Sequence, residues 1–137
     1  MDKMILNWKF IVMGFIVAVV LYVAGASLVQ VSILKGILYV LAPIIGGFTV
    51  TYLNNEDYVT NIINGSFASG MAGFTAVFII LWLIEPVPVF EGNLGLIIVI
   101  AVIRAVMAFV IGAVLGLIGG MMGILIKAHD FKKENLI

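Results

Sequence analysis

Four long apolar segments, separated by short polar stretches, fill most of this chain. They cover about residues 10–29, 36–53, 60–84 and 105–126. An α-helix rises about 1.5 Å per residue, so about 20 residues span a hydrocarbon core about 30 Å thick. Lipid requires a backbone that satisfies its own hydrogen bonds, and the segments lack the strict alternation of barrel strands. The pattern therefore predicts an all-α integral membrane bundle of four transmembrane helices.

The last apolar segment is longer than one simple span, because residues 94–126 carry a single charge, Arg104. If Arg104 lies at a membrane interface, residues 105–126 form the span and residues 86–104 form an interfacial or re-entrant segment. If the span begins at Leu94, Arg104 is buried at a cost of at least about 2.5 kcal/mol unless Glu85 or Glu91 pairs with it. We expect the interfacial placement.

The connections between segments are short. Residues 54–57 leave room only for a tight turn, so the second and third helices are expected to be antiparallel neighbours. Asn54 and Asn55 are suited to cap the N-terminus of the third helix, and Asp57 favours its positive end. Pro86 cannot continue that helix and is expected to end it.

Composition favours a single membrane domain over residues 1–137. Only 10 % of the residues are charged, whereas soluble domains carry about 25 %. Lysines precede the first segment and follow the last, which predicts a cytoplasmic tail at residues 127–137, both termini in the cytoplasm and a place in the cell membrane. Residues 24–26 resemble a signal-peptide cleavage site, but the apolar run continues past them, and we expect a retained helix.

The same composition argues against several functions. The formal net charge is zero, so nothing suggests nucleic-acid binding. The absence of cysteine excludes disulfides and thiol chemistry. One histidine and seven carboxylates are few and scattered, so we expect no metal site and no cofactor. No Ser/His/Asp set or paired carboxylates share one depth, so we do not expect an enzyme.

Small residues recur at helical spacing in the third and fourth segments. Such rows let helix backbones approach closely in lipid. The series is Gly65, Ser69 and Gly73 in the third segment and Ala108, Gly112, Gly116 and Gly120 in the fourth. Two interpretations remain open, namely packing between helices of one chain and a seam that joins the chain to a copy or to a larger membrane complex.

A polar pattern marks the start of the third segment. Asp57, Asn61 and Asn64 follow an i, i+4, i+7 spacing and share one helix face. Polar groups in membranes usually face the bundle interior or a wet cavity. They either fix the register of the helices by hydrogen bonds or line a polar site, to which Arg104 would add a charge. Pro43, inside the second segment, predicts a kink or a hinge.

The region from the end of the second segment through the third carries a recognisable set of residues. The set is Gly46, Gly47, Phe48, Tyr52, Leu53, Asp57, Tyr58, Asn64, Gly65, Ala68, Gly70, Ala72 and Gly73. It resembles a domain-of-unknown-function family of small, glycine-rich archaeal membrane proteins, known mostly from methanogens. The resemblance implies a source and a four-helix bundle, but no activity and no catalytic residue.

These patterns predict two different roles. The leading hypothesis is a non-catalytic membrane protein that packs as a homo-oligomer or as a small subunit of a larger membrane complex. It rests on the small-residue series and on the surplus apolar segment at residues 94–103. The alternative is a small transporter or channel for an ion or an apolar solute, and it rests on the polar pattern, Pro43 and Arg104. In both cases the lipid bilayer is the expected surrounding.

Overall fold

The computed structural model describes residues 7–28, 30–55, 57–84 and 94–134, with side chains described up to residue 130. Within these residues the fold is all-α. The helices are α1 (Trp8–Leu28), α2 (Ser32–Leu53), α3 (Tyr58–Ile79) and α4 (Leu94–Glu134), and a π-helical stretch, η1 (Ile80–Ile84), continues α3. In the part of the chain that the structure describes, four helices are long and apolar enough to cross a membrane. The predicted all-α bundle of four membrane-spanning helices is thereby confirmed.

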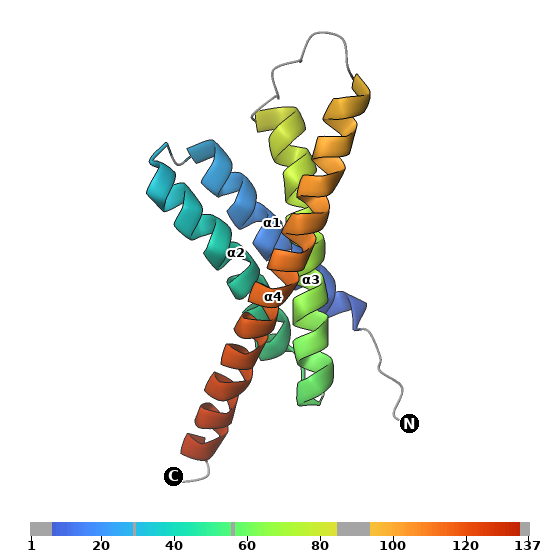
Figure 1. Ribbon diagram of the computed structural model, residues 1–137. Coiled ribbons are helices and arrows are strands. Elements are labelled where there is room, and N and C mark those ends of the chain that lie inside the picture. Colours follow the sequence, from blue (N-terminus) through green and yellow to red (C-terminus); the bar gives the residue numbers. More distant parts are fainter. Residues whose placement is uncertain (1–6, 29, 56, 85–93, 135–137) are drawn as a thin grey trace.

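The helices form two antiparallel pairs that cross. α1 and α2 are one pair, α3 and α4 are the other, and the pairs meet near their middles and splay apart towards the ends (Figure 1). The buried core at the crossing consists mainly of small side chains, including Ala18, Ala42, Ala68 and Ala72. Small residues dominate because only they let helix backbones approach closely enough to pack without a hydrophobic drive from water.

The last helix differs from the sequence-based expectation. Residues 94–103 belong to the same continuous helix as residues 105–126, so the expected division at Arg104 into a separate segment and a span is corrected. The position of Arg104 at a membrane interface stays a prediction. Residues 86–93 lie outside the described part of the chain. A charge does not break a helix, since arginine is a good helix former and Ala105 follows it. The helix also continues past Lys127 to Glu134, so the expected tail begins as helix.

The turn between α2 and α3 is capped differently from the expectation. Asp57 is the N-cap of α3, and its side chain accepts a hydrogen bond from the main-chain N–H of Thr60 over 3.0 Å. Asn54 instead caps the C-terminus of α2. The correction has a simple cause: α2 ends at Leu53 and α3 begins only at Tyr58, so the last residue of the turn is the one placed to reach the free N–H groups.

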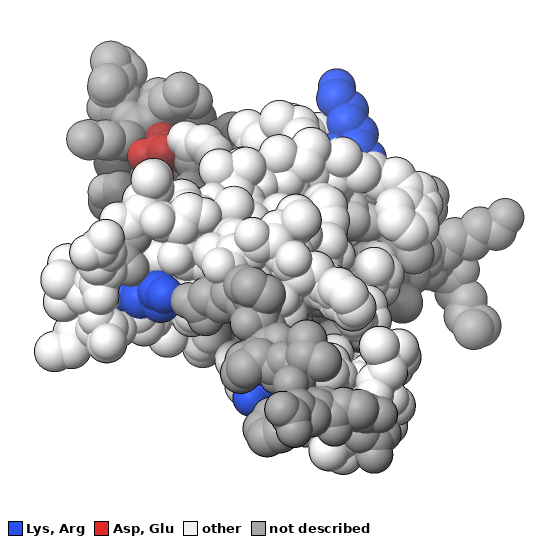
Figure 2. All heavy atoms as spheres, turned by 90° about the horizontal axis from the view of Figure 1, so that it is seen from above, with Lys and Arg blue, Asp and Glu red and all other residues white. Residues whose placement is uncertain are grey.

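The exterior of the bundle is apolar. Large side chains such as Val110 and Leu125 are 54 % and 69 % exposed. In the view from above, the described charged side chains are few and stand apart on an uncharged surface (Figure 2). Water would penalise such a surface, whereas hydrocarbon does not. The chain is accordingly a multi-pass membrane protein.

Candidate functional site

The structure brings the small residues of α3 and α4 together along one seam. Gly73 lies against Ala108, Ser69 lies against Gly112, and Gly65 and Ser69 lie against Gly116. Gly120 lies next to Thr51 of α2 and Ile62 of α3. All seven small residues singled out in the sequence therefore make contacts inside one chain.

The seam is tight enough to exclude a side chain. A methyl group on Gly112 would lie 2.7 Å from the carbonyl oxygen of Ser69, and one on Gly73 would lie 2.5 Å from that of Ala108. A methyl group on Gly116 would meet the side chain of Ser69 and the main chain of Gly65. Backbone atoms cannot rotate away as a flexible side chain can, so these positions require glycine.

Two serines of α3 connect this seam to its neighbours by hydrogen bonds. The Ser69 hydroxyl donates to the carbonyl oxygen of Pro43 in α2 over 2.7 Å. The Ser66 hydroxyl donates to the carbonyl oxygen of Ala113 in α4 over 2.8 Å. α2 runs as one helix through Pro43. The carbonyl of Pro43 thus serves as an anchor between helices.

The polar pattern of α3 divides into two environments. Asp57 is exposed at the turn, whereas Asn61 and Asn64 are 3 % and 1 % exposed. The Asn61 amide donates to the carbonyl oxygen of Asn54 over 3.4 Å. Neither the amide nitrogen nor the oxygen of Asn64 has a hydrogen-bond partner among the described residues. The three residues keep the expected helical spacing, but only Asn61 and Asn64 are buried in the interior of the bundle.

Arg104 lies apart from the other three polar residues. It is exposed on α4, one turn before Ala108, which packs against Gly73 in the far half of α3. Glu85 and Glu91, its candidate partners, lie outside the described residues. Arg104 therefore does not join Asp57, Asn61 and Asn64 in one site.

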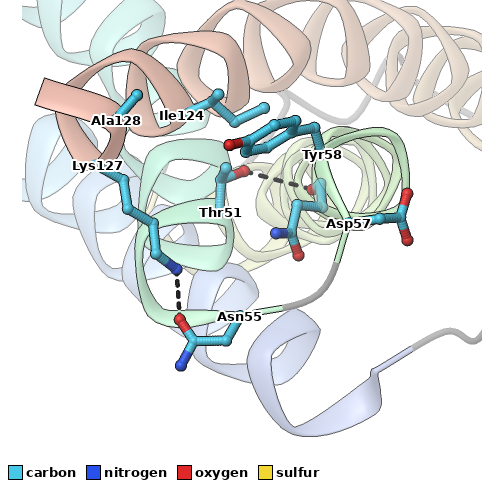
Figure 3. A pocket seen from close by; sticks show the side chains of 8 residues that line it. Thr51, Asn55, Asp57, Tyr58, Ile124, Lys127 and Ala128 are labelled. Atoms are coloured by element: carbon cyan, nitrogen blue, oxygen red, sulfur yellow. Dashed lines mark hydrogen bonds between the residues drawn. The ribbon is translucent and has the colours of Figure 1, made fainter. Parts of the chain in front are cut away.

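A pocket of about 440 Å³ opens where α2 ends, α3 begins and α4 passes. We call it the Lys127 pocket. Its polar lining comprises Thr51, Asn55, Asp57, Tyr58, Asn61 and Lys127, and its apolar lining comprises Ile124 and Ala128 (Figure 3). It therefore combines two opposite charges, several uncharged polar groups and an aliphatic wall contributed by α4.

Lys127 fixes one side of this pocket. Its ammonium donates to the main-chain oxygen of Asn54 over 2.7 Å and to the side-chain oxygen of Asn55 over 2.6 Å. Both acceptors follow the last turn of α2, where the helix dipole favours a positive charge. Lys127 thus acts as a capping cation supplied by another helix.

Asp57 and Thr51 complete the pocket's polar network. Hydrogen bonds from the side chain and from the main-chain N–H of Thr60 lower the pKa of Asp57 below its ordinary value, so the carboxylate stays charged at the positive N-terminus of α3. The Thr51 hydroxyl lies 3.1 Å from the carbonyl oxygen of Gly47 and 3.4 Å from that of Asn61. The two helix ends are therefore stabilised by opposite charges.

Sequence reasoning missed the Lys127 pocket. The sequence features that could have indicated it are the turn with Asn54 and Asn55 and the lysine at position 127. Both were expected at the same end of the bundle. Their contact depends on the register of α3 against α4, which no pattern in the sequence states. Within the described residues no group of His, Cys, Asp or Glu could hold a metal ion. The residues that line the pocket offer hydrogen bonds, two opposite charges and an apolar wall.

Comparison with known proteins identifies a family for this chain. The model of a family of unknown function, DUF5518, matches residues 8–126. No curated protein and no solved structure matches this chain. The match spans all four helices up to the end of the apolar part of α4.

Proposed function

Because the chain belongs to the family DUF5518, whose function is unknown, we propose a role from its own architecture. The protein is a non-catalytic membrane component that assembles with a second copy of itself through α4. We also propose an archaeal source, which the resemblance of residues 46–73 to small, glycine-rich archaeal membrane proteins implies.

The exposed side of α4 carries this proposal. Its most apolar stretch has a mean hydropathy of 2.9, the highest of the four spans, yet only 11 % of it is buried within the chain, against 28–33 % for the others. A row of aliphatic side chains runs along it at alternating spacings of four and three. We call this row the α4 stripe, and its members, 41–58 % exposed, are Ile103, Met107, Val110, Val114, Leu117 and Met121.

The stripe suits contact with an identical helix. Residues that repeat at an average of 3.5 positions keep one face towards a partner helix in a left-handed crossing. At about 100° per residue the stripe lies on the opposite side of α4 from Gly112 and Gly116. The glycine side of α4 already packs against α2 and α3. The aliphatic side is therefore the one that remains for contact with a second copy. Copies inserted in the same direction place their α4 helices parallel about a two-fold axis.

The charged residues of α4 support a definite placement in the bilayer. Arg104 and Lys127 are 23 positions apart, which corresponds to about 35 Å along a helix. A hydrocarbon core is about 30 Å thick, so a tilted α4 brings both charges to opposite interfaces. By the positive-inside rule the Lys127 end faces the cytoplasm, with both termini on that side of the cell membrane.

Cysteine cross-linking tests the assembly, and the cysteine-free chain makes it straightforward. Val110→Cys and Val114→Cys are introduced singly, and native membranes are oxidised before electrophoresis and mass spectrometry. We expect both variants to form disulfide-linked homodimers, because a two-fold axis beside the stripe brings each residue close to its own copy. Ile16→Cys on α1, 52 % exposed, is the matched control and should stay monomeric.

The outcomes separate the possible assemblies. Equal cross-linking of Ile16→Cys and Val114→Cys would mean random collision and would contradict the proposal. An adduct of Val114→Cys with a different protein would replace self-assembly by membership in a larger membrane complex. A strictly monomeric protein in native membranes would reject both forms of assembly.

One observation favours a second candidate, transport of a small solute. Asn61, Asn64 and Ser69 are buried along one side of α3, and the Asn64 amide has no hydrogen-bond partner among the described residues. A buried polar row that leads inward from a pocket is suited to water or a small solute. The test is the flux of small solutes into liposomes that contain the protein. Loss of this flux in a folded Asn64→Leu variant would support transport, and unchanged flux would reject it.

A further inference from the structure

The Lys127 pocket has the chemistry of an amphipathic ligand site. Lys127, Asn55 and Tyr58 stand on its polar side, and Ile124 and Ala128 form its apolar wall. Along α4 the wall continues into the exposed side chains of Met121 and Leu125. A ligand with a charged head and an aliphatic tail would satisfy both parts at once.

The polar side offers hydrogen-bond donors that the fold leaves available. An ammonium has three donors, and two of those of Lys127 are used by the oxygens of Asn54 and Asn55. Because the side-chain oxygen of Asn55 faces Lys127, the amide nitrogen of this exposed residue remains for another acceptor. The Tyr58 ring lies over the same pocket, between Ile124 and Asp57 (Figure 3), and its hydroxyl adds a third donor.

The negative charge in the pocket narrows the choice of ligand. The Asp57 side chain points away from Lys127 in Figure 3 and accepts the hydrogen bond from Thr60. A ligand with one negative charge is attracted by Lys127 and the N-terminus of α3, whereas a second negative charge would add repulsion from Asp57. A phosphate diester carries one charge, but inorganic phosphate near pH 7 carries more than one on average.

We propose that the Lys127 pocket binds the phosphate diester of a membrane phospholipid. Lys127, Asn55 and Tyr58 donate to the phosphate oxygens, and the hydrocarbon chains lie along α4 from Ile124 towards Met121. Charge-assisted hydrogen bonds to phosphate are among the stronger polar contacts. The bound lipid would join the end of α2, the start of α3 and the turn of α4 that carries Lys127, and its chains would reach Met121, the last residue of the α4 stripe.

Native mass spectrometry of the detergent-purified full chain tests the site. The protein is titrated separately with dioleoylphosphatidylethanolamine, dioleoylphosphatidylglycerol, dioleoylglycerol and inorganic phosphate. We expect one tightly bound molecule of either phospholipid and no comparable binding of dioleoylglycerol, which has the same chains without phosphate. Lys127→Met should weaken binding at least about tenfold and Tyr58→Phe about fivefold, since each removes a hydrogen bond to a charged group.

Two further variants control for fold and for general attraction to lipid. Lys9→Met removes an exposed lysine near the start of α1 and should leave binding unchanged. Lys127→Arg keeps the charge and should retain most of the affinity. If Lys127→Met fails to fold, Tyr58→Phe still decides, because it removes only one oxygen atom from an exposed ring.

Three results would overturn the proposal. Unchanged phospholipid binding in both Lys127→Met and Tyr58→Phe would place the lipid elsewhere. Binding of dioleoylglycerol as tight as that of the phospholipids would mean that only the acyl chains are recognised. Inorganic phosphate that binds as tightly as the phospholipids would assign the pocket to a soluble phosphate compound instead.

Discussion

The ammonium of Lys127 and the main-chain carbonyl of Asn54 are joined by a hydrogen bond of 2.7 Å, although 73 positions separate them in the chain. The contact connects the end of α4 to the end of α2. It places a positive charge where the carbonyl groups of α2 have no further helical partners. A lysine that the sequence places just after the last apolar segment is thus also a helix cap.

The first prediction concerns this cap. Lys127→Met should lower the free energy of unfolding by about 1–2 kcal/mol, because the Asn54 carbonyl loses a charged donor. Thermal denaturation in detergent measures the change. Lys127→Arg is the matched control and should recover most of the stability, so an equal loss in both variants would contradict a capping role.

The second prediction concerns the glycine seam. Gly116→Leu should destabilise the bundle by at least about 3 kcal/mol, because the added side chain meets Ser69 and the backbone of Gly65. Gly36→Leu is a matched control on α2, where an added Cβ has no neighbouring atom within 4 Å. That control should leave the melting temperature unchanged or slightly raised, since glycine is a poor helix former. Comparable losses in the two variants would mean that the crossing is not tightly packed.

The third prediction compares the two buried asparagines. Asn64→Leu should be neutral or raise stability by about 1 kcal/mol, since it replaces a buried amide without a described hydrogen-bond partner by an apolar side chain of similar volume. Asn61→Leu should lower stability, because the Asn54 carbonyl loses the Asn61 amide. Denaturant titration in mixed micelles measures both, and a clear loss of stability in Asn64→Leu would contradict this prediction.

The fourth prediction concerns pH. Hydrogen bonds from the side chain and from the main-chain N–H of Thr60 lower the pKa of Asp57 in the folded protein below the 3.8 of an unperturbed aspartate. The charged cap therefore stabilises the fold fully above pH 3.8, and this contribution is lost as pH falls through the lower, folded pKa. The melting temperature of the wild type should drop more steeply below pH 3.8 than that of Asp57→Asn, which keeps a capping oxygen but does not titrate. Parallel curves would show that the Asp57 charge does not contribute.

The sequence by itself determined the fold class. Long apolar stretches can satisfy their backbone in lipid only as helices or closed barrels, so their number and length, which are local properties, predicted four spans. It also identified the small residues and the buried asparagines, because helical spacing alone places Gly112 with Gly116 and Asn61 with Asn64. Local rules failed where two of them competed. The charge of Arg104 predicted the start of a membrane span at this residue. The helix nevertheless continues through Arg104, because arginine and its neighbours favour helical structure.

Only the tertiary structure decided what those residues meet. Whether Gly116 packs against Gly65 or against another chain depends on the register and crossing of two helices, and many registers bury equally small residues. The same register brought Lys127 of α4 to Asn54 of α2 and created a pocket between them. Hydrophobic length fixes how many times a chain crosses the bilayer, but the pairing of side chains from distant segments follows from packing, which no single segment encodes.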